Sequence, residues 1–326
     1  MRNNALTMCC GVCVAGAFGV FTRWMQNLTA FDEQGLYVQG SLWGWMLLLL
    51  CAAAAAVLIG ALYFLRSHEG LVSSPNFGEA HAGGGMPRQA AWLVIAVFMA
   101  IACGALLITA GSSQYASLLR ILALLGLAAD AGFAGMASAG GKGNGEESGA
   151  SPLVCLASVL PVAFCCFWLV VSYRQDAATA VVWRYGPEIT AIACSLLAFY
   201  YVAGQAFGRP RPYTAMFFCG YGAFLCLTTL PDSRLIALQL MLAACAMMQI
   251  FFLGSLTANL RRPAAAESEE EAPDAAAEEA APPEEFDTLA DAMRAEQEEE
   301  DLADSFVEYD PGEPGRRKTP REPKNR

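Results

Sequence analysis

The chain has 326 residues, of which 56% are hydrophobic, and its mean hydropathy is +0.39. A soluble domain must keep a wetted polar surface, so a composition this apolar indicates an integral membrane protein. All 12 cysteines lie within apolar runs, where a thiol packs as a small hydrophobe. The cysteines therefore give no sign of an extracellular disulfide framework.

The formal net charge of −11 is unevenly distributed along the chain. Up to and including Arg262 there are 13 basic and 10 acidic residues, whereas 7 basic and 21 acidic residues follow it. We expect residues 1–262 to form a transmembrane domain and residues 263–326 a disordered acidic tail, because Ala, Glu, Asp and Pro cannot bury a core. Such a tail argues against nucleic acid or an anionic lipid surface as its main partner.

Eight apolar runs are long enough to cross a bilayer as helices that rise 1.5 Å per residue. They cover residues 5–21, 42–65, 90–111, 117–139, 152–172, 189–207, 213–230 and 235–256. The sequence therefore predicts an all-α fold, a polytopic bundle of about eight transmembrane helices. An even number of spans places both ends of this bundle on the same side of the membrane.

The first run could be a secretory signal, because a basic residue precedes a short apolar core. We favour a retained span, since the run continues to Arg23 and Trp24, which suit a membrane border. Gly11, Ala15 and Gly19 recur every four residues, which predicts that they form a closely packed helix face.

Two groups of residues contain side chains of the kinds that bind metals. One is the pair Cys10 and Cys13, and the other is the set His68, Glu69, Glu79 and His81 in a polar loop. Hydrocarbon disfavours thiolates, and a Gly- and Ser-rich loop does not hold ligands in place. We interpret them as packing thiols and a solvated loop, and we expect no metal site and no cofactor.

Asp130 is the charge inside the fourth run. It follows Arg120 by ten residues, about 15 Å along a helix, so it lies near the midplane if Arg120 marks the membrane border. A midplane carboxylate is costly unless it faces protein or water, which makes Asp130 a functional candidate. The alternative is that this Ala- and Gly-rich run inserts only halfway, with Asp130 near its exit.

The two runs at residues 189–207 and 213–230 face each other across a tight turn. Pro187 and Glu188 suit the first turn of the earlier helix, where a missing N–H costs nothing and a carboxylate complements the helix dipole. Pro210 and Pro212 end the helices, while Arg209 and Arg211 stay out of hydrocarbon. The sequence predicts a transmembrane helical hairpin here.

Four further polar residues lie within the last three spans or at their edges. With Asp130 they form our candidate intramembrane polar site: Tyr201, Gln205, Gln239 and Gln249. Glutamine amides in a span can equally hydrogen-bond between helices in a purely structural role.

The distribution of basic residues favours a cytoplasmic location for both termini. With that orientation, cytoplasmic flanks hold eight basic residues: Arg2, Arg66, Arg88, Lys142, Arg209, Arg211, Arg261 and Arg262. The other side holds five: Arg23, Arg120, Arg174, Arg184 and Arg234.

The acidic tail contains a short apolar pattern. Phe286, Leu289 and Met293 are spaced three and four residues apart, so a helix formed on a partner would present them on one face. We treat these three as candidate contacts for a cytoplasmic protein partner. The alternative is a tail that is solvated by water and binds no partner.

The sequence argues against an enzyme. Neither histidine lies in a span, which removes haem ligation and rhomboid-type proteolysis, and an aspartyl intramembrane protease needs two aspartates where Asp130 is alone. Residues 173–232, including SYRQDAATAVVWRYGPE and AFYYVAGQAFGRPRP, resemble a loose group of uncharacterised multi-spanning membrane proteins of anaerobic Gram-positive bacteria. The resemblance implies a plasma-membrane location and no activity.

Two functions from different classes follow as hypotheses. One is a membrane scaffold or signalling subunit that acts through its cytoplasmic tail. The other is a small-solute or ion transporter that uses Asp130. We favour the first, because one internal charge is thin support for an ion pathway and the halves of the chain show no internal repeat.

Overall fold

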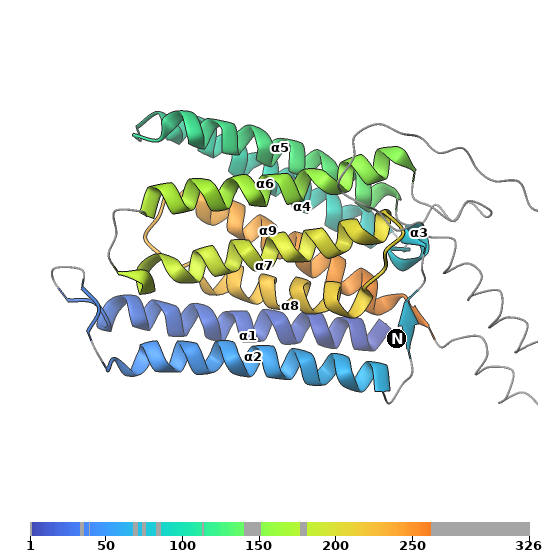
Figure 1. The fold of residues 1–326 in the computed structure, drawn as a ribbon, viewed down its shortest axis with the longest axis horizontal. Coiled ribbons are helices and arrows are strands. Elements are labelled where there is room, and N and C mark those ends of the chain that lie inside the picture. Colours follow the sequence, from blue (N-terminus) through green and yellow to red (C-terminus); the bar gives the residue numbers. More distant parts are fainter. Residues whose placement is uncertain are drawn as a thin grey trace, which may run out of the picture. The chain divides into compact units, whose positions relative to one another are not determined.

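The structure is a computed structural model that describes residues 2–32, 36–38, 40–67, 71–73, 76–82, 86–112, 114–139, 151–176 and 181–261. Long helices lie side by side in it (Figure 1). These helices are α1 (Arg2–Thr29), α2 (Leu42–Ser67), α4 (Met86–Thr109), α5 (Ala116–Ala139), α6 (Pro152–Asp176), α7 (Val182–Ala206), α8 (Pro212–Thr228) and α9 (Ile236–Ala258). Shorter elements are β1 (Val72–Ser73), α3 (Phe77–Ala80), η1 (Ala110–Ser112) and β2 (Leu260–Arg261).

The expected all-α membrane bundle is confirmed. Each of the eight apolar runs is a helix, and seven of the described helices are long and apolar enough to cross a membrane. The remaining one, α8, has 17 residues, or about 26 Å, which is the lower limit for a span. Prolines at its start and a turn after Thr229 limit its length.

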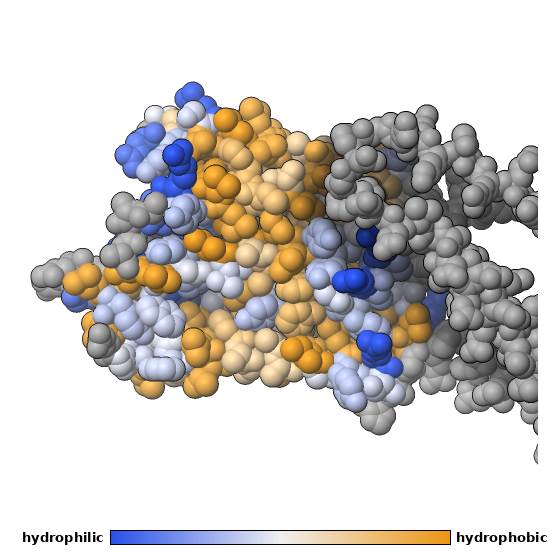
Figure 2. All heavy atoms as spheres, viewed as in Figure 1, coloured by the Kyte–Doolittle hydropathy of each residue, from blue (hydrophilic) through white to orange (hydrophobic). Residues whose placement is uncertain are grey.

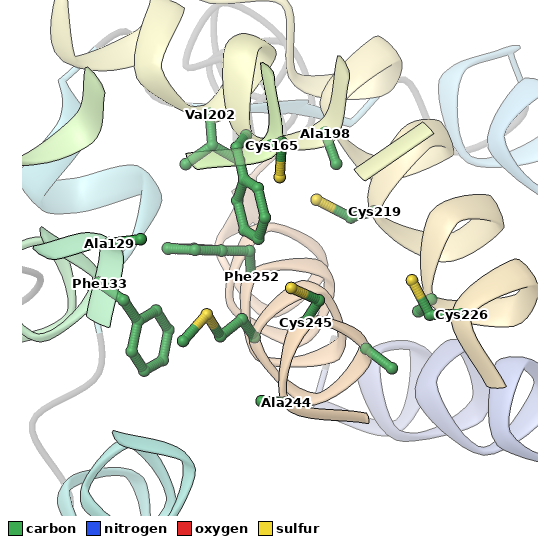
Figure 3. Packing of buried hydrophobic residues seen from close by; sticks show 14 of the residues in the cluster. Ala129, Phe133, Cys165, Ala198, Val202, Cys219, Cys226, Ala244, Cys245 and Phe252 are labelled. Carbon is green, nitrogen blue, oxygen red and sulfur yellow. The ribbon is translucent and has the colours of Figure 1, made fainter. Parts of the chain in front are cut away.

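Helix α9 lies at the centre of the bundle. It packs against α1, α4, α7 and α8, and more of its length is buried than that of any other candidate span among the described helices. Phe252 of α9 meets Phe133 of α5 with 5.6 Å between ring centroids, among buried cysteines and alanines (Figure 3). Helix α2 lies on the outside and packs on α1 and α8.

The sides of the bundle are apolar and its two ends are polar. Figure 2 shows a hydrophobic band across the middle of one face, between hydrophilic residues at each end. Large side chains such as Leu49, Val57, Ile101 and Leu124 are exposed on α2, α4 and α5. Water would penalise such a surface, whereas lipid tails solvate it, so the described helices form an integral membrane protein in contact with a bilayer.

The end of the bundle that carries the N-terminus also carries the end of α9. There β1 pairs with β2 in antiparallel register, Val72 with Arg261 and Ser73 with Leu260. The side-chain amide of Asn259 donates to the carbonyls of Ala80 and Ala82, at 3.1 and 2.8 Å. The segments that follow α2 and α9 are thus tied together at one end (Figure 1).

The packed face of α1 differs from the expected one. Gly16 and Gly19 approach α8, since a Cβ on Gly19 would lie 2.1 Å from Thr228 Oγ1 and one on Gly16 2.5 Å from Leu227 Cδ1. Gly11 has open space around it and is exposed. A spacing of four drifts around a helix of 3.6 residues per turn, so Gly11 and Gly19 need not share a face.

Helix α7 begins earlier than expected, at Val182. Pro187 is therefore inside the helix and Glu188 lies beyond its first turn, which corrects the expectation that both belong to the helix start. Since Glu188 is 1% exposed, its role is not that of an exposed first-turn acid. The charge that compensates it comes from another part of the chain.

Candidate functional site

A buried ion pair joins α1 to the turn between α8 and α9, at the end of the bundle opposite the β1–β2 pair. Arg23 Nε donates to Asp232 Oδ1 at 2.6 Å, and Arg23 Nη2 donates to Asp232 Oδ2 at 3.1 Å. The two side chains are 1% and 5% exposed. A bidentate arginine–carboxylate contact is the strongest form of such a pair.

The remaining guanidinium protons of Arg23 also have partners. Nη1 donates to Gln26 Oε1 at 2.8 Å and to the carbonyl of Trp183 at 3.0 Å, and Nη2 donates to the carbonyl of Arg184 at 3.2 Å. These two carbonyls lie in the first turn of α7. Arg23 therefore connects α1, α7 and the α8–α9 turn through one side chain.

A second ion pair lies beside the first. Arg234 contacts the carboxylate of Glu188, and its Nη2 lies 3.8 Å from Asp232 Oδ2. Ser172 of α6 donates to Glu188 Oε1 at 3.1 Å. Burial lowers the pKa of Arg234 to about 10, so the guanidinium is still protonated at neutral pH. We call these residues, Arg23, Ser172, Glu188, Asp232 and Arg234, the buried charge cluster.

A polar cavity of 680 Å³ opens beside the buried charge cluster. Charges of both signs line it: Arg23, Arg184, Arg234, Asp32, Asp176 and Asp232. Its size and mixed charge suit a small polar solute. However, three of these six charged side chains already take part in the Arg23–Asp232 and Glu188–Arg234 ion pairs. The geometry therefore describes a contact that holds helices together more directly than a vacant binding site.

The five residues of the candidate intramembrane polar site do not meet in one place. Asp130 lies near the middle of α5, partly buried, and its Oδ1 is buried with no hydrogen-bond partner among the described residues. The depth of Asp130 in the bilayer, at the midplane or near the exit of a half-inserted run, stays a prediction, as does the role of Asp130 in function.

Gln249 makes an interhelical contact inside the bundle. Its Nε2 donates to Ser195 Oγ of α7 at 2.8 Å, and Ser195 Oγ lies 3.2 Å from Cys226 Sγ of α8. The absence of a side chain on Gly222 makes room for the amide, because a Cβ there would lie 2.2 Å from Gln249 Oε1. This polar contact links three helices, as a structural glutamine does.

The other three residues lie at the two ends. Gln205 Oε1 is 2.9 Å from His81 Nε2, at the end that carries the β1–β2 pair. Tyr201, one turn earlier on α7, stacks on Phe218 with 5.5 Å between centroids. Gln239 donates to the backbone carbonyl of Asp232 at the opposite end. These residues therefore do not form a single polar path through the described helices.

His81 is the histidine that the structure describes. It is 1% exposed and packs between Phe77 and Phe252, with ring centroids 4.6 and 5.4 Å away. Burial lowers its pKa to about 4, so the ring is neutral at physiological pH. Among the described residues no group of three or more His, Cys, Asp or Glu could hold a metal, and His68 and Glu69 lie outside them.

Sequence reasoning missed the buried charge cluster. It placed Arg23 at the membrane border and did not single out Asp232, whereas the two residues are buried against each other. A signal was present in the spacing of Arg23, Gln26 and Asn27, which lie three and four residues apart. Such spacing predicts one polar helix face, and a polar face beside an apolar helix needs a protein partner.

Phe286, Leu289 and Met293 lie outside the described residues, as does the boundary after Arg262. The division into residues 1–262 and 263–326 therefore stays a prediction.

The fold and its buried charges define a class, that of the polytopic helical membrane proteins. No protein-family model, no curated protein and no solved structure matches the chain. The expected resemblance to multi-spanning proteins of anaerobic Gram-positive bacteria is therefore an untested proposal.

Proposed function

We propose that this chain is a membrane-embedded scaffold or accessory subunit that acts through the acidic segment after Arg262. The observation that carries the proposal is the packed interior around α9, where apolar side chains from α5, α6 and α8 fill the space (Figure 3). A transporter needs polar groups that converge on a solute near the midplane, and the candidate polar residues lie apart. A closed bundle instead suits an anchor that holds a segment at the membrane.

The partner would bind the apolar face of Phe286, Leu289 and Met293. A groove that buries each of these side chains gains about 1.5 to 3 kcal/mol per residue. We further propose that the membrane is the plasma membrane and that both termini are cytoplasmic, which the count of eight against five basic residues supports.

Crosslinking and co-purification of the full chain test this function. Proteins recovered with the wild type should be lost from a triple variant in which Phe286, Leu289 and Met293 become Ser. A matched triple variant outside this face, Ala281→Ser, Ala292→Ser and Ala295→Ser, should retain them. If both triple variants recover the same proteins as the wild type, the apolar face does not bind them and the proposal is wrong.

A second candidate function is transport of an ion or a small solute. The buried Asp130 Oδ1 without a hydrogen-bond partner among the described residues favours it, because an unpaired carboxylate oxygen near mid-helix is costly to keep. Reconstituted vesicles should then show potential-driven cation flux that Asp130→Asn abolishes. Glu146→Gln, in the segment between α5 and α6, is the matched control and should leave the flux unchanged.

A further inference from the structure

A groove between α6 and α7 reaches the α7–α8 turn, at the end of the bundle that carries the β1–β2 pair. Its volume is 840 Å³. Val159 and Val162 of α6 line one wall, Tyr200 and Phe207 of α7 line the other, and Arg209 and Arg211 lie at its end. We call this the arginine groove.

The apolar part of the arginine groove faces outward from the bundle. Val159 is 42% exposed, and Tyr200 and Phe207 are each 56% exposed. In a membrane these side chains meet acyl chains. Tyrosines near the end of a span are typical of the zone where tails give way to headgroups.

The polar end of the groove has an excess of positive charge. Arg209 and Arg211 are exposed, and neither forms an ion pair with a described residue. A smaller cavity of 480 Å³ continues from Arg211 to Arg66, whose guanidinium lies 5.9 Å from the centroid of the Tyr213 ring. None of the described residues that line the two cavities is acidic, so no described carboxylate in either lining compensates the charge of these three arginines.

These observations specify the chemistry of an occupant. A bound molecule should carry negative charge at the end of the membrane span and apolar chains along α6 and α7. We infer that the arginine groove binds an anionic phospholipid, with its phosphate at Arg209 and Arg211 and an acyl chain against Val159, Val162 and Tyr200. Basic pockets between spans bind anionic headgroups in this way. The inference is independent of the proposed function of the tail and of the orientation in the membrane.

Native mass spectrometry of the full chain in neutral detergent tests the inference. Phosphatidylglycerol and phosphatidylcholine with identical acyl chains are titrated, and the first bound lipid is compared. An arginine near an anionic lipid strengthens binding about fivefold, so Arg209→Gln with Arg211→Gln should weaken phosphatidylglycerol binding about 25-fold. Binding of phosphatidylcholine should change little.

Two further variants separate a built site from general attraction. Arg120→Gln with Arg174→Gln removes the same charge from exposed positions at the other end and should leave binding unchanged. Val159→Trp fills the groove, keeps both arginines, and should weaken phosphatidylglycerol binding.

Three results would overturn the inference. One is equal binding of the two lipids to the full chain, which would follow if its own acidic residues occupied the arginines. Another is an equal loss in the two double variants. The third is unchanged binding in Val159→Trp, which would mean that the arginines attract lipid without a groove.

Discussion

The Arg23–Asp232 pair is buried beside the polar cavity, and its energetics follow from that burial. Desolvation of two charges is expensive, and the bidentate contact together with the Trp183 and Arg184 carbonyls offsets much of the cost. Removal of one partner leaves the other charge buried and unpaired. The contact therefore holds α1, α7 and the α8–α9 turn together.

We expect Asp232→Asn or Arg23→Gln to lower the free energy of unfolding by about 3 to 5 kcal/mol. The double variant Arg23→Met with Asp232→Leu should recover part of this loss, because it leaves no unpaired charge. Unfolding of the purified chain in mixed micelles measures both effects. Arg174→Gln, at an exposed position, is the control, and a loss as large as that of Arg23→Gln would contradict a special role for the pair.

His81 makes the stability depend on pH. Its native pKa of about 4 lies below the ordinary value of 6.5, so the unfolded chain binds a proton that the native chain does not. The free energy of unfolding therefore keeps its full value above pH 6.5 and falls as the pH is lowered towards 4. At pH 5 the loss due to His81 is about 2 kcal/mol.

The difference between wild type and His81→Gln isolates this effect from the titration of carboxylates. The unfolding free energy of the wild type should fall more steeply between pH 7 and pH 5 than that of His81→Gln. His68→Gln should retain the slope of the wild type. Parallel curves for the wild type and His81→Gln would mean that His81 is not buried as a neutral ring.

Helix α1 packs against α8 through the face on which its small residues allow the two helices to approach closely. A Cβ added to Gly16 or Gly19 would collide with Leu227 or Thr228 of α8, whereas one added to Gly11 would have no described atom of another element within 4 Å. Helices in lipid gain little from hydrophobic burial against each other, so the small residues that allow close packing decide which face turns inward.

Gly19→Ala should therefore destabilise the bundle by about 1 to 3 kcal/mol, because its Cβ would collide with Thr228 and lie 3.3 Å from Phe224. Gly11→Ala should be neutral or slightly stabilising, since alanine favours a helix by up to about 1 kcal/mol over glycine. The unfolding midpoint in detergent reports both changes. The reverse order of the two variants would show that α1 packs through the face of Gly11.

For the whole molecule, the antiparallel order of the eight long helices brings the start of α1 and the end of α9 to one end of the bundle (Figure 1). Arg66, Arg209, Arg211 and Arg261 lie in segments at this same end. At the other end, Arg23 and Arg234 are held in buried ion pairs.

A reporter fused after Arg262 should be active only in its cytoplasmic form, because basic residues favour that side. A second fusion, placed between α6 and α7, should show the opposite location. Activity of an exterior-dependent reporter after Arg262 would reverse the orientation while it leaves the fold unchanged.

The apolar composition indicated the class of protein, and the order and length of the apolar runs indicated where its helices lie in the chain. A run of about 20 apolar residues crosses a bilayer whatever its neighbours are, because every backbone hydrogen bond is made within the helix. The eight helical runs and the turn that contains Arg209 and Pro210 could therefore be read from the sequence, although α7 begins at Val182, before its apolar run.

Tertiary structure decided how the polar residues are partnered. Arg23 and Asp232 are 209 residues apart, and Gln249 and Ser195 are 54 apart, so no local pattern indicates that they touch. The rotation of each helix about its axis settles these contacts, and that rotation depends on packing at positions such as Gly19 and Gly222. The sequence specifies which segments are helices in the membrane. Which face of each helix turns towards its neighbours is decided by close packing, because lipid solvates every apolar face equally well.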